Sequence, residues 1–350
     1  MTKPVKRIFT TAATLLFLAE TTRSIAQPLP PPIIDMHLHS DAADSNGPPP
    51  LGICAPAAEL PTWDPRESWP VAFTRWTKNP ECERPVWSPT TDVEVMRQTI
   101  EVLRRRNITA ITSGPQPHLD RWMKAEPDRI VPALGFNFAT KPVPSPEQVH
   151  RSLREKRYRA FAEVGIQYQG VSPSDARFEP YLAVAEKMDV PMGIHIGTGP
   201  PGARYLPPFP NYRARLHSPL VLEDALARHP RLRVWIMHAG WPMLDDLLAV
   251  LWAHPQVHVD VGVISWVLPR KEFHRYLQRI VEAGFVKRVM FGSDQMNWPG
   301  VIEPAIEAIE SALFLSEKEK REILFENAAR FLRLTPEEIA ELHGTSGARP

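Results

Sequence analysis

The chain has almost no net charge, only two cysteines and, beyond its N-terminal segment, no long run of apolar side chains. Its 350 residues include 41 basic and 40 acidic side chains, which gives a formal net charge of +1. This balance argues against a partner held by bulk charge, so we expect no nucleic-acid partner. No later apolar run is long enough to cross a bilayer, so we expect no membrane association once the N-terminal segment is removed. Hydrophobic residues make up 43% of the chain, enough for a large core.

The N-terminal segment is typical of an export signal. It has a basic start over residues 3–7, a mostly apolar stretch over residues 8–19 that is short for a bilayer span, and small residues at 24–26. We therefore predict a signal peptide over residues 1–26 and a periplasmic or secreted mature protein. A retained membrane anchor or a disordered tail is the alternative.

A proline-rich segment over about residues 41–90 is predicted to be a long irregular loop. Loops of this length in compact domains are usually lids or binding loops, so we expect a cap over the substrate, with a local mini-core as the alternative. Cys54 and Cys82 both lie in it, and an oxidising compartment makes a disulfide between them the expected state. Two free thiols or metal ligation are the alternatives, and the wide separation of the two cysteines argues against metal. The segment also holds four tryptophans, Trp63, Trp69, Trp76 and Trp87.

Strand and helix patterns alternate along the rest of the chain. Apolar strand segments are predicted at 33–39, 108–111, 130–134, 160–166, 191–196, 232–237, 257–261 and 288–291. Helical patterns are predicted at 93–107, 119–125, 146–156, 179–188, 218–230, 243–253, 271–283 and 316–332. This alternation implies a parallel sheet with right-handed crossovers. Eight such units in residues 27–350 fit a closed (β/α)8 TIM barrel, with a doubly wound open sheet as the alternative.

Side chains that bind metals recur at the carboxyl ends of these strands. His37 and His39 are one residue apart, so they point to the same side of the first strand, and Asp35 is expected there too. Four other strands end in one such residue each: Glu163, His195, His238 and Asp294. Active sites of (β/α)8 barrels lie at this face, so the set predicts a metal site. For any one of these residues alone, a hydrogen bond in the core or a helix cap would be a sufficient explanation.

This arrangement resembles the amidohydrolase superfamily, and is most similar to its branch that includes aminocarboxymuconate-semialdehyde decarboxylase and related hydrolases. The resemblance covers roughly residues 33–334. It is carried by His37-x-His39, His195, His238, Asp294 and the closing segment Glu326–Leu332.

The resemblance implies a divalent ion, with zinc expected, and a position left open for water. The expected ligands are His37, His39, His195 and Asp294. Asp294 would also act as general base and then protonate the leaving group. His238 would polarise the substrate carbonyl.

Glu163 departs from that branch, which typically uses one ion and no carboxylate from the fourth strand. Other branches, including metal-dependent deoxyribonucleases, have a bridging glutamate there. Glu163 is therefore a candidate ligand, and two ions are expected if it bridges, although one ion is favoured. The alternative is a carboxylate buried against a lysine or arginine, or hydrogen-bonded to a ligand histidine.

Substrate contacts are expected on the same face. Arg204 and Arg213 lie in the loop after the fifth strand and are candidates to pair with a substrate carboxylate, with solvated surface arginine as the alternative. Trp241 and Trp298 closely follow the sixth-strand and eighth-strand residues, and we expect them to wall the pocket or simply to pack. The remaining histidines considered show no strand-end pattern and are predicted to be surface or structural: His217, His229, His254, His258 and His274.

The function predicted from the sequence is an exported metal-dependent hydrolase that cleaves an ester, lactone or amide bond of a small organic molecule. A metal-dependent non-oxidative decarboxylase of an unsaturated or aromatic acid is the first alternative. An exported protein that binds a metal or ligand without catalysis is the second. The expected partner is a small-molecule substrate, and a homodimer is left open.

Overall fold

The computed structural model describes residues 29–139 and 143–344, and the predicted signal peptide lies outside them. Its centre is one sheet of eight parallel strands in the order β1-β4-β5-β6-β7-β8-β9-β10. The strands are β1 (Ile33–His39), β4 (Ile108–Ser113), β5 (Ile130–Phe136), β6 (Ala160–Val164), β7 (Met192–His195), β8 (Val234–Met237), β9 (His258–Asp260) and β10 (Val289–Met290). Met36 N donates to Phe291 O (2.9 Å), which joins β1 to the chain after β10. The sheet therefore nearly closes on itself, and the predicted (β/α)8 barrel is confirmed.

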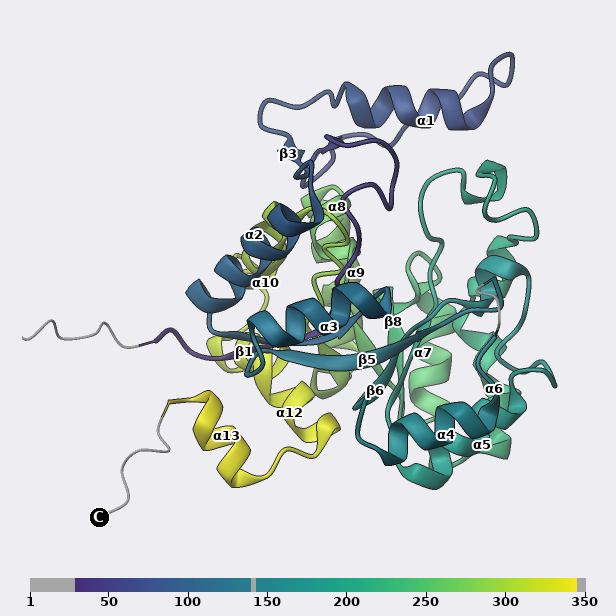
Figure 1. Cartoon of the computed structure of the whole chain (residues 1–350), viewed down its shortest axis with the longest axis vertical. Coiled ribbons are helices and arrows are strands. Elements are labelled where there is room, and N and C mark those ends of the chain that lie inside the picture. Colours follow the sequence, from purple (N-terminus) through teal and green to yellow (C-terminus); the bar gives the residue numbers. More distant parts are fainter. Residues whose placement is uncertain (1–28, 140–142, 345–350) are drawn as a thin grey trace, which may run out of the picture.

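Helices follow the strands and cover the outside of the sheet, and α4 and α5 lie side by side on it (Figure 1). The α-helices after the first strands are α2 (Asp92–Arg105), α3 (Gln116–Ala125), α4 (Pro146–Arg154), α5 (Glu179–Met188), α6 (Glu223–Arg228) and α7 (Leu244–Ala253). Those that follow are α8 (Ile264–Val267), α9 (Arg270–Glu282), α10 (Ile302–Glu310), α11 (Glu317–Arg321), α12 (Asn327–Leu332) and α13 (Pro336–Leu342). Short 3₁₀ segments are η1 (Ile166–Gln169), η2 (Ala203–Tyr205), η3 (Ala214–His217), η4 (Pro219–Leu222), η5 (His238–Gly240), η6 (Val286–Arg288) and η7 (Pro299–Val301).

Several predicted elements differ from the structure, three of them as follows. The helix predicted at 218–230 is η4 followed by α6, and the helix predicted at 316–332 is α11, a π-helical turn η8 (Glu322–Glu326) and α12. The strand predicted at 288–291 is only β10. Phe291 N donates to Ile323 O in η8 (2.9 Å), so on this side the backbone pairs with a helix, while Phe291 O accepts from Met36 N of β1.

The segment 41–90 is not wholly irregular, which corrects the prediction. It contains the helix α1 (Trp69–Lys78) and a two-stranded antiparallel pair, β2 (Gly52–Ile53) with β3 (Val86–Trp87). The predicted disulfide between Cys54 and Cys82 is confirmed. It closes the base of an arm, residues 54–82, whose helix α1 lies apart from the barrel helices at the top of Figure 1.

The arm contacts the loop that follows β7. Trp69 Nε1 donates to Pro201 O (3.1 Å), and the ring of Trp63 lies 4.8 Å from that of Tyr205. Gly202 has φ +66°, and a β-carbon there would lie 2.3 Å from the Trp69 indole. The close approach of the indole to the backbone therefore requires a glycine at this position.

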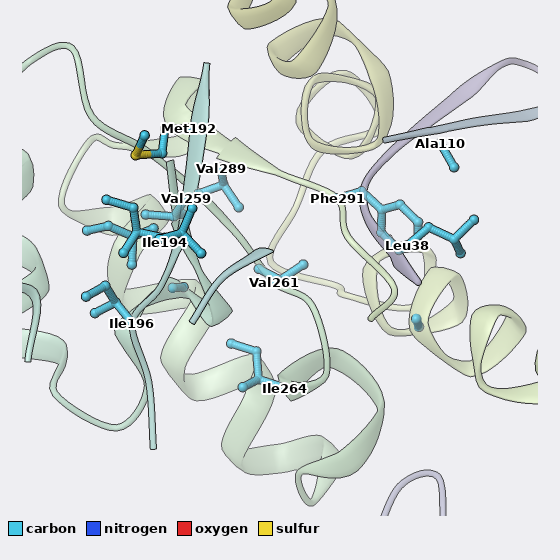
Figure 2. Close-up of a cluster of buried hydrophobic side chains, with 14 of the residues drawn as sticks. Leu38, Ala110, Met192, Ile194, Ile196, Val259, Val261, Ile264, Val289 and Phe291 are labelled. Carbon is cyan, nitrogen blue, oxygen red and sulfur yellow. The ribbon is translucent and has the colours of Figure 1, made fainter. Parts of the chain in front are cut away.

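The core has two parts. Apolar side chains such as Ile194, Val259 and Val289 pack the sheet against its helices (Figure 2). A second cluster draws side chains from β1, β4, β5, β6, β8 and β10, among them Met36 and Trp235, so it fills the barrel interior. In the described part of the chain, no helix combines the length and apolar character needed to cross a membrane.

Candidate metal centre

The two histidines of β1 direct their Nε2 atoms to one point. These atoms are 3.1 Å apart, and Oδ1 of Asp294 lies 3.6 Å from His37 Nε2 and 3.2 Å from His39 Nε2. Asp294 N donates to His37 O (2.6 Å), so the backbone that closes the barrel also fixes the carboxylate beside the histidines. The structure thus brings together three predicted side chains from opposite ends of the sequence.

Asp35 does not join them, which corrects the expectation from strand alternation. The register of β1 shifts between Asp35 and Leu38, so the period of two is interrupted there. The Asp35 carboxylate is completely buried and accepts hydrogen bonds from His37 N and Ser293 N, each 2.9 Å long. Burial raises the pKa of Asp35 to about 6. Its role in the structure is therefore to hold two backbone amides.

Glu163, His195 and His238 form the other half of the centre. Glu163 Oε1 is hydrogen-bonded to His195 Nδ1 and lies 3.6 Å from His238 Nε2. His195 Nδ1 and His238 Nε2 are 3.0 Å apart. Glu163 Oε2 reaches the first half, 3.9 Å from His37 Nε2 and 3.7 Å from His39 Nε2. All six side chains predicted from the strand ends therefore meet at one place.

The donor atoms fit a divalent ion. Two sets of three donors lie within 4.8 Å of one another: His37, His39 and Asp294, and His37, Glu163 and His238. Imidazole nitrogens and carboxylate oxygens are ligands of zinc, manganese and related ions. Both sets share His37, whose Nε2 lone pair can bind one ion, so the geometry favours one ion over two. His195 belongs to neither set and reaches them through Glu163.

The electrostatics of the centre also suit an added cation. Among the described residues, every ion pair of Glu163, Asp260 and Asp294 is with a histidine, never with lysine or arginine. Burial would raise the pKa of Glu163, but His195 and the hydrogen bonds from histidines hold it well below its usual value. Burial would lower the pKa of His39, but Asp294 and Asp41 raise it to about 9. A bound cation would displace the protons that these imidazoles hold.

Asp260, at the end of β9, supports the centre from behind and was missed in the sequence. It is completely buried, and its Oδ2 lies 3.4 Å from His37 Nδ1. Oδ1 accepts from His238 N (3.1 Å) and Gly262 N (2.8 Å), and Oδ2 accepts from Trp235 Nε1 (3.0 Å). A carboxylate behind an imidazole holds the proton on Nδ1 and leaves Nε2 free to bind a metal.

Two residues of the centre have left-handed backbone conformations. His238 has φ 62° and Asp294 has φ 47°. Such angles cost energy in residues with a β-carbon and concentrate at functional sites. The fold therefore places these two side chains at a cost in stability.

A comparison with protein families agrees with this geometry. The family profile described as Amidohydrolase matches residues 34–334. The chain belongs to the amidohydrolase family. The match includes every strand of the barrel except the first residue of β1, and all six side chains of the centre. No curated protein matches this amidohydrolase at a significant level.

Solved structures share the fold of this amidohydrolase at low sequence identity. An uncharacterised TIM-barrel protein from Bordetella bronchiseptica is 17% identical, with a TM-score of 0.55 over 86% of this chain and 98% of its own. A 5-carboxyvanillate decarboxylase from Novosphingobium aromaticivorans, complexed with manganese and a nitrobenzoic acid, is 15% identical, with a TM-score of 0.55 over 89% of this chain and 100% of its own. A probable 2-pyrone-4,6-dicarboxylic acid hydrolase from Acinetobacter baumannii is 14% identical, with a TM-score of 0.53 over 86% and 99%.

The residues predicted to bind substrate lie in different surroundings. Trp298 is 4% exposed and its indole N–H donates to Leu51 O (2.9 Å), so it packs between the barrel and the segment 41–90. Trp241 is half-buried and its Nε1 donates to Glu272 Oε1 (3.2 Å). Arg204 and Arg213 are exposed on the loop after β7. The structure places neither arginine in an ion pair with the carboxylates of the centre.

Two further side chains, His217 and Tyr168, pack around His195. His217, predicted to be surface or structural, is completely buried with its ring 5.3 Å from that of His195, and burial lowers its pKa to about 3. Tyr168 lies in η1 with its ring 4.6 Å from His195. Burial raises the pKa of Tyr168 well above its usual value, and the charges of Glu163 and Asp294 add to this effect. Tyr168 lies four residues after the end of β6 and His217 lies 22 residues after the end of β7, and no local pattern distinguishes either from a packing residue.

Proposed function

We propose that this amidohydrolase hydrolyses an ester, lactone or amide bond of a small, uncharged organic molecule and uses one divalent ion, with zinc expected. The ion would be held by His37, His39 and Asp294, with Glu163 and His195 completing the site. When bound, such an ion polarises a substrate oxygen and lowers the pKa of water towards neutrality. The observation that carries the proposal is the position of Asp294, 3.2 Å from His39 Nε2 and fixed by its backbone bond to His37.

Asp294 would act as the general base. A carboxylate beside the ligand histidines can take a proton from the attacking water and later give it to the leaving group. His238 Nδ1 donates to Gly262 O (3.0 Å), which leaves Nε2 directed at the centre. Burial would lower the pKa of His238, but Glu163 and Asp294 raise it. When protonated, His238 can donate from Nε2 to the substrate carbonyl oxygen.

The charge of the centre supports an uncharged substrate. Glu163, Asp260 and Asp294 bring three carboxylates together, and in the described residues only histidines pair with them. Among the described residues, no arginine or lysine pairs with the carboxylates of the centre, so a substrate carboxylate would find no such fixed side chain to bind it. A neutral carbonyl group needs no such partner.

A non-oxidative decarboxylase of an aromatic acid is the second candidate. A 5-carboxyvanillate decarboxylase and a 2,6-dihydroxybenzoate decarboxylase share the fold, with TM-scores of 0.55 and 0.51. The first was solved with manganese and a nitrobenzoic acid bound. In that reaction the charge of the ion would have to offset the carboxylates of the centre.

The test is a substrate panel with the protein loaded with zinc or manganese. The panel contains 4-nitrophenyl acetate, dihydrocoumarin, benzamide and 2,6-dihydroxybenzoate. Hydrolysis is expected, with ¹⁸O from labelled water in the acid product and loss of orders of magnitude in Asp294→Asn. Release of carbon dioxide without ¹⁸O in the product would contradict hydrolysis and favour decarboxylation. Tight metal binding with no turnover of any compound would favour a binding protein.

We also propose export, with residues 1–26 as the signal peptide and residues 41–90 as the cap. The Cys54–Cys82 disulfide supports an oxidising compartment, and the contacts of the arm with the loop after β7 support a cap. N-terminal sequencing of protein recovered from the periplasm or medium tests the cleavage after residue 26. A homodimer stays a prediction, which light scattering would test.

A further inference from the structure

We propose that Tyr168 is a catalytic residue whose hydroxyl donates a hydrogen bond to the substrate oxygen at the metal centre. This inference rests on the proposed function. It gives the substrate carbonyl group a second hydrogen-bond donor from the protein, in addition to His238. Tyr168 lies in η1, which begins directly after β6, the strand that carries Glu163. Its ring packs 4.6 Å from the ring of His195.

The Tyr168 hydroxyl lacks a hydrogen-bond partner among the described residues, unlike its counterparts elsewhere in the fold. The other tyrosines that are buried or half-buried donate to protein acceptors: Tyr158 to Gln116, Tyr181 to Pro144, Tyr212 to Thr198 and Tyr276 to Ala239. Tyr205 is 58% exposed and can bond to water. The Tyr168 side chain is half-buried and its hydroxyl is not fully enclosed, so a bound molecule can reach it. An unpaired hydroxyl on a ring that packs against His195 therefore points to a ligand as its acceptor.

The Tyr168 ring is fixed by its neighbours. Its centroid lies 4.5 Å from Phe209, 6.0 Å from Tyr212 and 5.6 Å from His217. A β-carbon on Gly199, which has φ +61°, would lie 2.5 Å from the Tyr168 hydroxyl oxygen, so a glycine is needed there. Rings on several sides and the loop backbone against its end leave the hydroxyl little freedom. A donor held in place before the substrate arrives is the kind that contributes most to catalysis.

A neutral hydrogen-bond donor suits the chemistry at this position. A phenol is protonated at neutral pH and can donate one hydrogen bond. When water attacks the substrate carbonyl carbon, negative charge develops on the carbonyl oxygen, and a hydrogen bond to that oxygen becomes stronger. Tyr168 gives up no proton in this step, so the transfers between water, Asp294 and the leaving group are unchanged.

The test compares Tyr168→Phe with Tyr212→Phe in the metal-loaded enzyme. Tyr168→Phe should lower kcat for 4-nitrophenyl acetate by about 10- to 100-fold with a smaller change in KM. Its metal content and melting temperature should stay at the wild-type values. Tyr212→Phe removes a hydroxyl from the same ring cluster, but one that donates to Thr198 O, so kcat should stay within about twofold. Gly199→Ala should lower kcat with Tyr168 in place, because its β-carbon displaces the hydroxyl.

Binding of acetohydroxamic acid gives a readout besides turnover. The carbonyl oxygen of the hydroxamate would accept a hydrogen bond from Tyr168. Tyr168→Phe should therefore raise the Kd of the hydroxamate by about tenfold or less, and Tyr212→Phe should leave it unchanged. Equal kcat and equal Kd in Tyr168→Phe and wild type would overturn the inference, as would equal losses in both variants. Loss of hydroxamate affinity in Tyr168→Phe alone, with no ester turned over by wild type, would keep the inference and remove the proposed hydrolysis. A wild type that neither binds the hydroxamate nor turns over an ester would remove both.

Discussion

Replacing Asp260 by asparagine tests how the protein prepares His37 to bind a cation. The carboxylate receives three hydrogen bonds, from His238 N, Gly262 N and Trp235 Nε1, and its Oδ2 lies 3.4 Å from His37 Nδ1. Burial would raise the pKa of Asp260, but the charge of His37 keeps it below its usual value, so the group is ionised. Asparagine has nearly the same shape and can keep an oxygen at the Oδ1 position.

The loss of stability in Asp260→Asn arises at the Oδ2 position. An amide group at the Oδ2 position would be a donor that faces two donors, Trp235 Nε1 and His37 Nδ1. The lost indole bond and the opposed donors should destabilise the fold by about 1–3 kcal/mol. His37 would have to place its proton on Nε2, where it blocks the lone pair. Loss of a supporting carboxylate typically lowers metal affinity by about 10- to 100-fold.

The assay is a competition for zinc against a chelator of known affinity, with thermal unfolding measured in parallel. Asp35→Asn is the matched control because Asp35 is an equally buried carboxylate that binds backbone amides and does not contact a ligand ring nitrogen. Its metal affinity should stay within about threefold of wild type. If Asp260→Asn also binds zinc within about threefold of wild type, the role assigned to this carboxylate is wrong.

Three further predictions concern the centre and the arm. Asp294→Asn should keep the melting temperature and lower kcat by orders of magnitude, while His195→Ala should lower the zinc content. Wild-type rates and zinc contents in both variants would contradict the proposed mechanism. Asp294 and Asp41 outweigh burial and raise the pKa of His39 from 6.5 to about 9. In chelator-treated protein, the contribution of protonated His39 to the free energy of unfolding should therefore be complete below pH 6.5. The protein should lose up to about 3 kcal/mol as the pH rises through 9, a loss absent in His39→Gln. Gly202→Ala should separate the arm from the loop after β7, because its β-carbon would lie 2.3 Å from the Trp69 indole. A protease should then cut the arm faster in the variant, and equal rates of cleavage in variant and wild type would count against this contact.

The repeated strand-and-helix pattern was sufficient to predict the barrel and the meeting of distant residues. Parallel strands joined by helices place all their carboxyl ends at one face, so the order of elements alone brings His37, His195 and Asp294 together. The disulfide was also predictable, because the chain has just two cysteines and an apparent export signal. These features depend on the order and type of residues along the chain.

The tertiary structure decided which atoms face which. A register shift in β1 turned Asp35 to the backbone, and no periodicity in the sequence marks that shift. Asp260 could be found only as the side chain behind His37, and Tyr168 only as a hydroxyl without a protein partner. Whether Glu163 faces a lysine or a histidine likewise depended on its neighbours across the barrel. Local sequence determines where elements begin and end, whereas hydrogen-bond partners come from strands far apart in the chain and exist only after the barrel has closed.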